Sequence, residues 1–152
     1  MLRKAKTSDV KMMHRMINLS AAKGEMLPRA LVDLYNHLRD FYVYMEDDDG
    51  PIVGIVGMSL FWENLAEIRS LYVSDEARHK GIGKKLVEAC ISEAITLEIY
   101  RVFALTYQKD FFNRMGFHEV QRTELPEKIW SDCFKCWKYP DFCDEFAMII
   151  EL

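Results

Sequence analysis

Apolar residues along the chain follow two different periods, which predict helices in some segments and strands in others. Spacings of three and four residues predict helices over residues 10–22, 28–38, 81–97 and 109–115. Runs rich in β-branched and aromatic residues predict strands, which we place at residues 2–5, 41–46, 52–61, 66–73, 101–106, 117–121 and 146–152. In the second helix, the predicted buried stripe consists of Leu31, Leu34, Tyr35 and Leu38. No repeat or linker divides the chain, so the pattern predicts a single α/β domain over residues 1–152.

Length, charge and cysteine content exclude several classes of protein. At 152 residues the chain is long enough to bury a core without disulfides or metals. Its formal net charge of −4 argues against nonspecific nucleic-acid binding, which requires a basic surface. No apolar run approaches the roughly 20 residues of a membrane span, and no secretion signal opens the chain. We therefore expect no nucleic-acid or membrane partner, and a cytoplasmic location in which the four cysteines are reduced.

The most informative stretch joins the predicted strand at residues 66–73 to the predicted helix at residues 81–97. Its turn contains Gly81 and Gly83 among four cations, which are Arg78, Lys80, Lys84 and Lys85. A glycine lets backbone amides approach a ligand because no Cβ stands in the way. A helix N-terminus adds unpaired N–H donors and a partial positive charge. This combination predicts a binding site for a phosphate or diphosphate group.

The spacing of the glycines distinguishes between the known phosphate-binding turns. A P-loop requires glycine at the position of Arg78 and Ser or Thr at that of Lys85, and a dinucleotide fingerprint requires a third glycine at that of Leu86. What remains is Arg78-x-x-Gly81-x-Gly83, five residues beyond the end of a strand. This pattern resembles the acetyl-CoA loop of the GNAT family of N-acetyltransferases. The alternative is an ordinary strand-to-helix turn with a solvated basic face.

The resemblance implies a fold and a cosubstrate. The order of the elements matches the acetyltransferase fold over nearly the whole chain, which implies a mixed central sheet of about six or seven strands flanked by about four helices. The implied cosubstrate is acetyl-CoA, and no metal is required. The residues expected to bind acetyl-CoA are Leu71, Tyr72, Val73, Arg78, His79, Lys80, Gly81, Ile82, Gly83, Lys84 and Phe112.

The implied reaction requires a base, because an amine arrives protonated at neutral pH and must lose a proton to attack a thioester. Glu67 is the predicted base, acting through one water molecule with its pKa raised by partial burial. A salt bridge from Glu67 to Arg69 is the alternative. Strand alternation predicts that Glu67, Arg69, Leu71 and Val73 share one face. The backbone of Leu71 and Val73 is expected to hold the pantetheine arm, and an amide near Val73 to polarise the carbonyl.

The segment at residues 111–117 resembles the Phe-Tyr-x-x-x-Gly-Phe motif of the family, with one departure. Phe112 stands where the family usually has a tyrosine that protonates the departing CoA sulfur. A thiol is already a fair acid, so the loss of this group does not by itself stop the reaction. Tyr107 is the predicted substitute acid, and a purely structural role for Tyr107 is the alternative.

Three segments narrow the resemblance to the single-domain N-acetylglutamate synthases of bacteria, a branch of the amino-acid N-acetyltransferases. These segments are residues 24–29, 105–112 and 125–130. The resemblance implies transfer of the acetyl group to the α-amine of L-glutamate by direct attack in a ternary complex, which opens arginine biosynthesis. Glutamate carries two carboxylates, so its pocket needs at least two cations. The candidates are Arg29, Arg69 and Lys128, for which a solvated surface position is the alternative.

Other functions stay open at this point. The acceptor could be another small amine or a protein N-terminus, and Phe112 leaves room for a non-catalytic module that binds acyl-CoA. The family often forms dimers, so a homodimer is a further expectation. Cys133, Cys136 and Cys143 have the spacing of half a zinc site. No His follows them, and His118 would have to come from another strand, so we predict reduced thiols, with a metal site as the alternative. Cys90 falls on a buried helix stripe, which is a poor place for a nucleophile.

Overall fold

The computed structural model describes residues 1–125 and 145–152 of the chain. These residues form seven strands and four α-helices: β1 (Leu2–Lys4), α1 (Val10–Ala22), α2 (Leu31–Asn36), β2 (Phe41–Met45), β3 (Ile52–Trp62), β4 (Leu65–Val73), α3 (Ile82–Thr96), β5 (Arg101–Thr106), α4 (Lys109–Arg114), β6 (His118–Val120) and β7 (Phe146–Glu151). The strands are hydrogen-bonded in the order β1-β2-β3-β4-β5-β7-β6, with β4 and β5 parallel. The predicted mixed sheet is confirmed. No helix in the described part of the chain is long and apolar enough to span a membrane.

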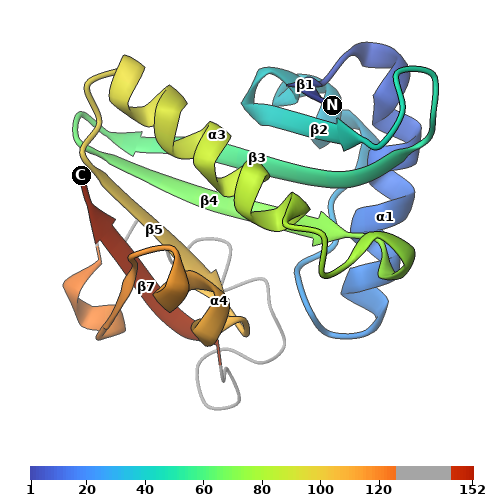
Figure 1. Cartoon of the computed structure of the whole chain (residues 1–152). Coiled ribbons are helices and arrows are strands. Elements are labelled where there is room, and N and C mark those ends of the chain that lie inside the picture. The colour runs from blue at the N-terminus through green and yellow to red at the C-terminus, as the bar shows by residue number, and fades with distance from the viewer. Residues whose placement is uncertain (126–144) are drawn as a thin grey trace. The chain divides into compact units, whose positions relative to one another are not determined.

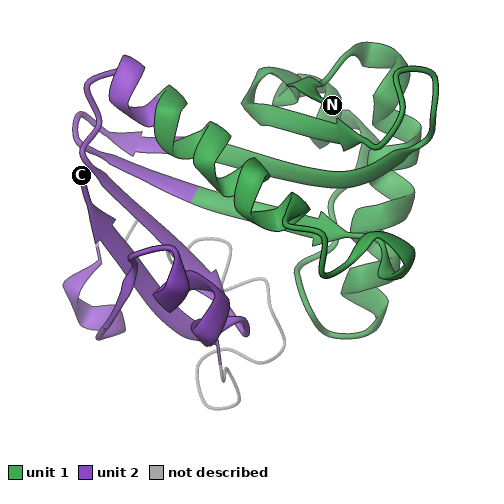
Figure 2. Cartoon of the chain, viewed as in Figure 1, with its two compact units in different colours: residues 1–59, 68–93 green, residues 60–67, 94–152 purple. Residues whose placement is uncertain are grey.

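The chain divides into two compact units, coloured separately in Figure 2. Unit 1 comprises residues 1–59 and 68–93, and unit 2 comprises residues 60–67 and 94–152. The polypeptide passes from one unit to the other within β3, β4 and α3. The prediction of a single domain over the whole chain stays a prediction, and each unit is described by itself below.

Unit 1 has helices on both faces of its sheet (Figure 1). Phe41 and Val43 of β2 are fully buried against α1 and α2, whereas the hydroxyl of Tyr42 donates to the carboxylate of Glu93 in α3 at 3.4 Å. Because successive side chains of a strand point to opposite faces, α1 and α2 cover one face and α3 covers the other. The core under α1 and α2 consists of Val10, Met13, Met16, Ile17, Leu34, Phe41, Val43 and Ile55.

Helix α2 is shorter than predicted, and its buried stripe is narrower. Leu34 is fully buried and Leu38 is partly buried, but Leu31 and Tyr35 are 38% and 43% exposed. The prediction was therefore wrong for Leu31 and Tyr35. The physical reason is length: a helix of six residues makes less than two turns, so one row of side chains reaches the core before the chain enters a 3-10 turn at Leu38–Asp40.

Gly57 of β3 allows the ring of Phe41 to lie directly on the neighbouring strand. Phe41 and Gly57 face each other in the antiparallel pair of β2 and β3. A Cβ on Gly57 would lie 2.9 Å from Cε1 of Phe41, which is closer than two carbon atoms can approach. The absence of a side chain at Gly57 therefore sets the position of the Phe41 ring, which matters for the site described below.

Unit 2 is built around β5. This strand pairs in parallel with β4 at Ala66 and Glu67 and in antiparallel with β7 along its whole length. Phe103 is fully buried at its centre and packs against the ring of Phe61, with the two ring centres 5.6 Å apart. The core of unit 2 consists of Leu65, Phe103, Leu125, Ala147 and Ile149.

A partly buried ion pair joins Arg3 of the N-terminal strand to Asp9, the residue directly before α1. The guanidinium of Arg3 donates to both carboxylate oxygens of Asp9, at 2.7 and 3.0 Å, and the backbone N–H of Lys6 donates to the same carboxylate at 2.7 Å. The hydrogen bond from Arg3 outweighs the effect of burial and lowers the pKa of Asp9 below its usual 3.8. Asp9 is therefore expected to stabilise the fold only while it is ionised.

We expect the Asp9→Asn variant to lose about 1.5–3 kcal/mol of unfolding free energy at neutral pH, the range for a hydrogen bond to a charged group. Because the folded-state pKa of Asp9 is lowered, the difference from wild type should be complete above about pH 4 and shrink as the pH falls further. Urea denaturation at pH 7, 5 and 3.5 measures this difference. Asp48→Asn, at an exposed position in the turn after β2, is the matched control and should change stability at none of these pH values.

Candidate functional site

The turn between β4 and α3 is shaped by its own side chains and by two residues with positive φ. Nε of Arg78 donates to the carbonyl of Val73 at 3.2 Å, and the guanidinium also pairs with Asp75 at 3.3 Å. His79 and Gly81 have φ values of +65° and +78°. These contacts return the chain to the end of β4, so that α3 starts directly after Gly81.

The start of α3 presents a row of available amides. The first hydrogen bond of the helix runs from the N–H of Lys85 to the carbonyl of Gly81, at 3.2 Å. Within the described residues, no acceptor is bonded to the amides of Gly81, Ile82, Gly83 or Lys84. A Cβ built on Gly81 would meet no atom within 4 Å, so the space in front of this residue is open. Four convergent donors beside open space fit a diphosphate group.

Cations surround this turn and are weakly paired. Nζ of Lys80 lies 3.1 Å from the carboxylate of Glu46, but both side chains are about half exposed. The ammonium of Lys85 lies 5.5 Å from the ring centre of Tyr44. Exposed pairs of this kind contribute little to stability, so Lys80 can exchange its partner for a phosphate at small cost.

Strand β4 does not alternate as the sequence predicted. Ser70 has a φ of +56°, which is outside the extended region, and so interrupts the period of two. Tyr72, after Ser70, packs against the core under α1 and α2, and the charge of Arg69, before Ser70, acts on the carboxylates of Asp33 and Asp40. The prediction that Arg69, Leu71 and Val73 share a face rests on an unbroken period of two, and the structure interrupts that period at Ser70.

Arg29 is a buried arginine whose guanidinium is fixed on two sides. Only 7% of its side chain is exposed. Its Nε donates to Oδ2 of Asp33 at 2.7 Å, and its guanidinium carbon lies 5.3 Å from the ring centre of Phe41. Its backbone carbonyl accepts a hydrogen bond from the side-chain amide of Asn18 in α1 at 3.3 Å. The cation is thus held by an anion at its edge and an aromatic ring at its face.

The pKa values of two carboxylates whose charges interact with Arg29 are shifted in opposite directions. Burial tends to raise the pKa of Asp33, but the hydrogen bond from Arg29 and the charges of Arg29, His37 and Arg69 outweigh it, so the pKa is lowered. At Asp40, burial dominates over the charges of His37, Arg29 and Arg69, so the pKa is raised. The charges of two predicted acceptor cations, Arg29 and Arg69, thus both act on Asp33 and Asp40.

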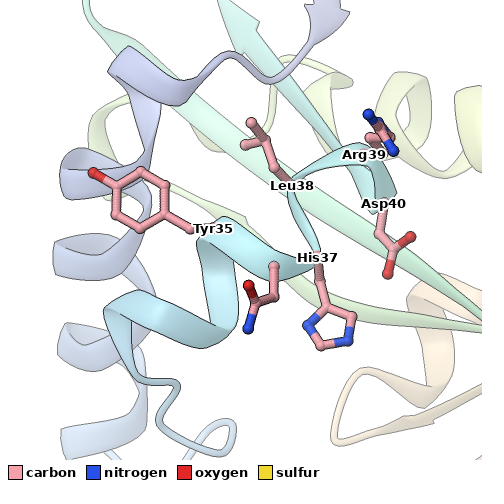
Figure 3. A pocket seen from close by; sticks show the side chains of 6 residues that line it. Tyr35, His37, Leu38, Arg39 and Asp40 are labelled. Atoms are coloured by element: carbon pink, nitrogen blue, oxygen red, sulfur yellow. The ribbon is translucent and has the colours of Figure 1, made fainter.

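A shallow pocket of about 510 Å³ lies at the end of α2 (Figure 3). In this view the side chain of Tyr35 lies on the opposite side of the segment from those of His37 and Asp40. His37 lines this pocket, and its Nδ1 lies 3.0 Å from Oδ1 of Asp33, the partner of Arg29. The sequence prediction did not include Asp33, His37 or Asp40. The spacing of four residues between Arg29, Asp33 and His37 is the signal that could have identified the first two.

The predicted catalytic residues lie in unit 2. Glu67 is 7% exposed and pairs with Phe103 in the β4–β5 ladder. Tyr107 directly follows β5 and is partly buried. Phe112, on α4, is 2% exposed and packs edge-to-face against Phe111 and Phe117. The roles of Glu67, Tyr107 and Phe112 stay predictions.

Several predicted residues lie outside the described part of the chain: Lys128, Cys133, Cys136 and Cys143. Among residues 1–125 and 145–152, no group of His, Cys, Asp or Glu is arranged to hold a metal. Cys90 is fully buried in α3, and burial raises the pKa of its thiol to about 12. The thiolate form that attacks a thioester is therefore scarce at Cys90.

Comparison with known proteins identifies the family of the chain. The model of the acetyltransferase (GNAT) family matches residues 13–119. An uncharacterised N-acetyltransferase of Chlorobaculum tepidum is 40% identical over 150 residues, which is 97% of this chain and 94% of the relative. The amino-acid acetyltransferase of Mycobacterium tuberculosis is 33% identical over 132 residues, covering 86% of this chain and 75% of the relative.

Solved structures agree over the full length of the chain. A Mycobacterium tuberculosis protein crystallised with CoA has a TM-score of 0.86 at 28% identity, covering 100% of this chain and 99% of that one. The N-acetylglutamate synthase of Neisseria gonorrhoeae, in complex with CoA and N-acetyl-glutamate, has a TM-score of 0.88 at 26% identity. This chain matches only 35% of the length of the Neisseria synthase.

Proposed function

Because this chain belongs to the acetyltransferase (GNAT) family and uses acetyl-CoA, we propose that its acceptor is the α-amine of L-glutamate. The protein would then be an N-acetylglutamate synthase that opens arginine biosynthesis. Relatives named amino-acid acetyltransferase and the Neisseria structure with N-acetyl-glutamate support this choice among GNAT acceptors.

The observation that carries the proposal is the buried Arg29. An arginine that is 7% exposed is costly to bury unless its charge has a partner, and Asp33 occupies only the Nε edge. The two terminal nitrogens of Arg29 are therefore suited to bind an anionic ligand, and a carboxylate matches their spacing. Arg69 supplies a second cation in the same cluster, as a substrate with two carboxylates requires.

The turn before α3 fits the cosubstrate. Bound acetyl-CoA supplies the thioester whose carbonyl the amine attacks. The amides of Gly81 to Lys84 and the side chains of Arg78 and Lys80 would hold its diphosphate, and the open space at Gly81 leaves room for it. The backbone of Leu71, Tyr72 and Val73 is our candidate for the pantetheine arm.

The remaining steps are assigned to side chains of unit 2. We assign to Glu67 the acceptance of the amine proton through one water molecule, a role that its burial in β4 favours. Tyr107 would donate the proton to the departing sulfur. The inert thiol of Cys90 supports direct attack by the amine rather than an acyl-enzyme formed at that residue.

A screen for CoA release tests the proposal. Purified protein is incubated with acetyl-CoA and a panel of amino acids, small amines and N-terminal peptides, and L-glutamate should give the highest kcat/KM. Glu67→Gln should lower kcat for L-glutamate by about 10²–10⁴-fold, the range for loss of a general base. Glu63→Gln, at an exposed position in the β3–β4 turn, is the matched control and should keep wild-type kcat.

The other outcomes identify the alternatives. Turnover of a different amine without turnover of glutamate would keep the family chemistry and reject the proposed acceptor. Tight binding of CoA without turnover of any amine would select the non-catalytic module, the reading that Phe112 in place of tyrosine favours.

A further inference from the structure

We propose that Asp33 is a positioning residue for acceptor binding: it holds Arg29 so that both terminal nitrogens of the guanidinium face the acceptor carboxylate. The proposal rests on the proposed function, because it assumes an acceptor with a carboxylate. It concerns a residue that contacts Arg29 and not the substrate.

The contacts of Arg29 occupy the Nε–H group and one face of its guanidinium and leave its two terminal nitrogens available to a ligand. The Nε–H group is bonded to Oδ2 of Asp33 at 2.7 Å, and the ring of Phe41 covers one face. Within residues 1–125 and 145–152, neither terminal nitrogen of Arg29 has a hydrogen-bond partner. No buried side-chain nitrogen or oxygen in this described part is unpaired, so these two nitrogens reach solvent although the side chain is 7% exposed. A fork of N–H groups at the end of a buried arginine is suited to bind a carboxylate through two hydrogen bonds.

Asp33 is itself held from the other side. Nδ1 of His37 lies 3.0 Å from Oδ1, the oxygen that does not bind Arg29. The three residues follow each other at intervals of four, from the segment before α2 to the residue after it. The same Nδ1 is hydrogen-bonded to the backbone carbonyl of Asp33 at 2.9 Å, so His37 attracts Oδ1 as an ion pair only while its imidazole is protonated.

Asp33 also reduces the repulsion between the two acceptor cations. Its carboxylate interacts with the charges of both Arg29 and Arg69. Without this anion, two guanidinium groups would share a weakly solvated region, and Arg29 would lower its energy by turning away from Arg69. The arginine side chain would then gain conformational freedom in the free enzyme and lose it again when the acceptor binds, so the acceptor would bind more weakly.

Steady-state kinetics of Asp33→Asn test the inference. At saturating acetyl-CoA, the KM for L-glutamate should rise about tenfold, while kcat and the KM for acetyl-CoA stay within twofold of wild type. Asp33→Glu, which can reach Nε again with its longer chain, should restore most of the affinity. In an Arg29→Ala background, Asp33→Asn should have no further effect on the KM for L-glutamate.

Two results would overturn the inference: an unchanged KM for L-glutamate in Asp33→Asn, or an equal further rise in the Arg29→Ala background. A fall in thermal stability with equal losses of affinity for both substrates would show that the ion pair is merely structural.

If the wild type does not acetylate glutamate, the proposed function fails. Calorimetric titration of the CoA-bound protein with L-glutamate then still tests the role of Asp33 in acceptor binding. Binding weakened tenfold by Asp33→Asn would keep the inference, and no binding by wild type would reject it.

Discussion

Replacement of Arg29 by alanine is expected to reduce kcat/KM for L-glutamate by about 30- to 1000-fold. The variant loses a charge-assisted, two-point contact with a carboxylate and leaves Asp33 without its partner, which together correspond to about 2–4 kcal/mol of acceptor binding. The loss should fall on the KM for L-glutamate and not on that for acetyl-CoA, because Arg29 belongs to the α2 segment and not to the turn before α3. Initial rates at varied glutamate and varied acetyl-CoA separate the two.

The matched control for this variant is Arg15→Ala. Arg15 lies on α1 and is exposed, so its removal deletes an equal charge without creating a cavity in the protein interior. The control should keep the wild-type KM for L-glutamate. If Arg29→Ala, folded and thermally stable, turned over glutamate as well as Arg15→Ala does, glutamate would not be the acceptor bound by Arg29.

Replacement of Gly81 by alanine is expected to raise the KM for acetyl-CoA about 10- to 100-fold. Gly81 has a φ of +78°, and a Cβ there would project into space that no atom within 4 Å occupies. That space is where we expect the diphosphate, so the methyl group would displace it from at least one amide donor, at a cost of about 1.5–3 kcal/mol. Titration with CoA followed by calorimetry, together with initial rates, measures the change.

The same substitution also strains the backbone, and this effect must be separated from the loss of binding. An L-residue with positive φ costs roughly 1–2 kcal/mol. Gly24 provides the control, because it has a φ of +76° just after α1, and Gly24→Ala should lower the unfolding temperature while leaving the KM for acetyl-CoA unchanged. An unchanged KM for acetyl-CoA in Gly81→Ala would argue against diphosphate binding at this turn.

Local patterns were sufficient to predict the elements of the fold and the turn before α3. The glycines, the cations and the strand before them are neighbours in sequence, and a helix N-terminus exposes its amides wherever it forms. The bounds of α3 and β5 follow the predicted ranges within one or two residues, because each element has a long and regular apolar pattern.

Local patterns failed where a distant segment decides the outcome. Nothing in the run around Ser70 indicates a positive φ, so the sequence pattern predicts an unbroken alternation that the structure interrupts at this residue. The sequence also predicts a wider buried stripe for α2, whereas a helix of only six residues buries one row of side chains and leaves Tyr35 exposed.

The sequence by itself determined the glycine-containing turn before α3 and the order of helices and strands, since both depend on interactions between near neighbours. The tertiary structure decided which charges meet. Arg29 and Asp33 come from a loop and a helix and form an ion pair next to the ring of Phe41, whose position against β3 depends on Gly57. In the proposed function this burial matters, because a guanidinium withdrawn from water and bound at only one edge favours an anion at the other.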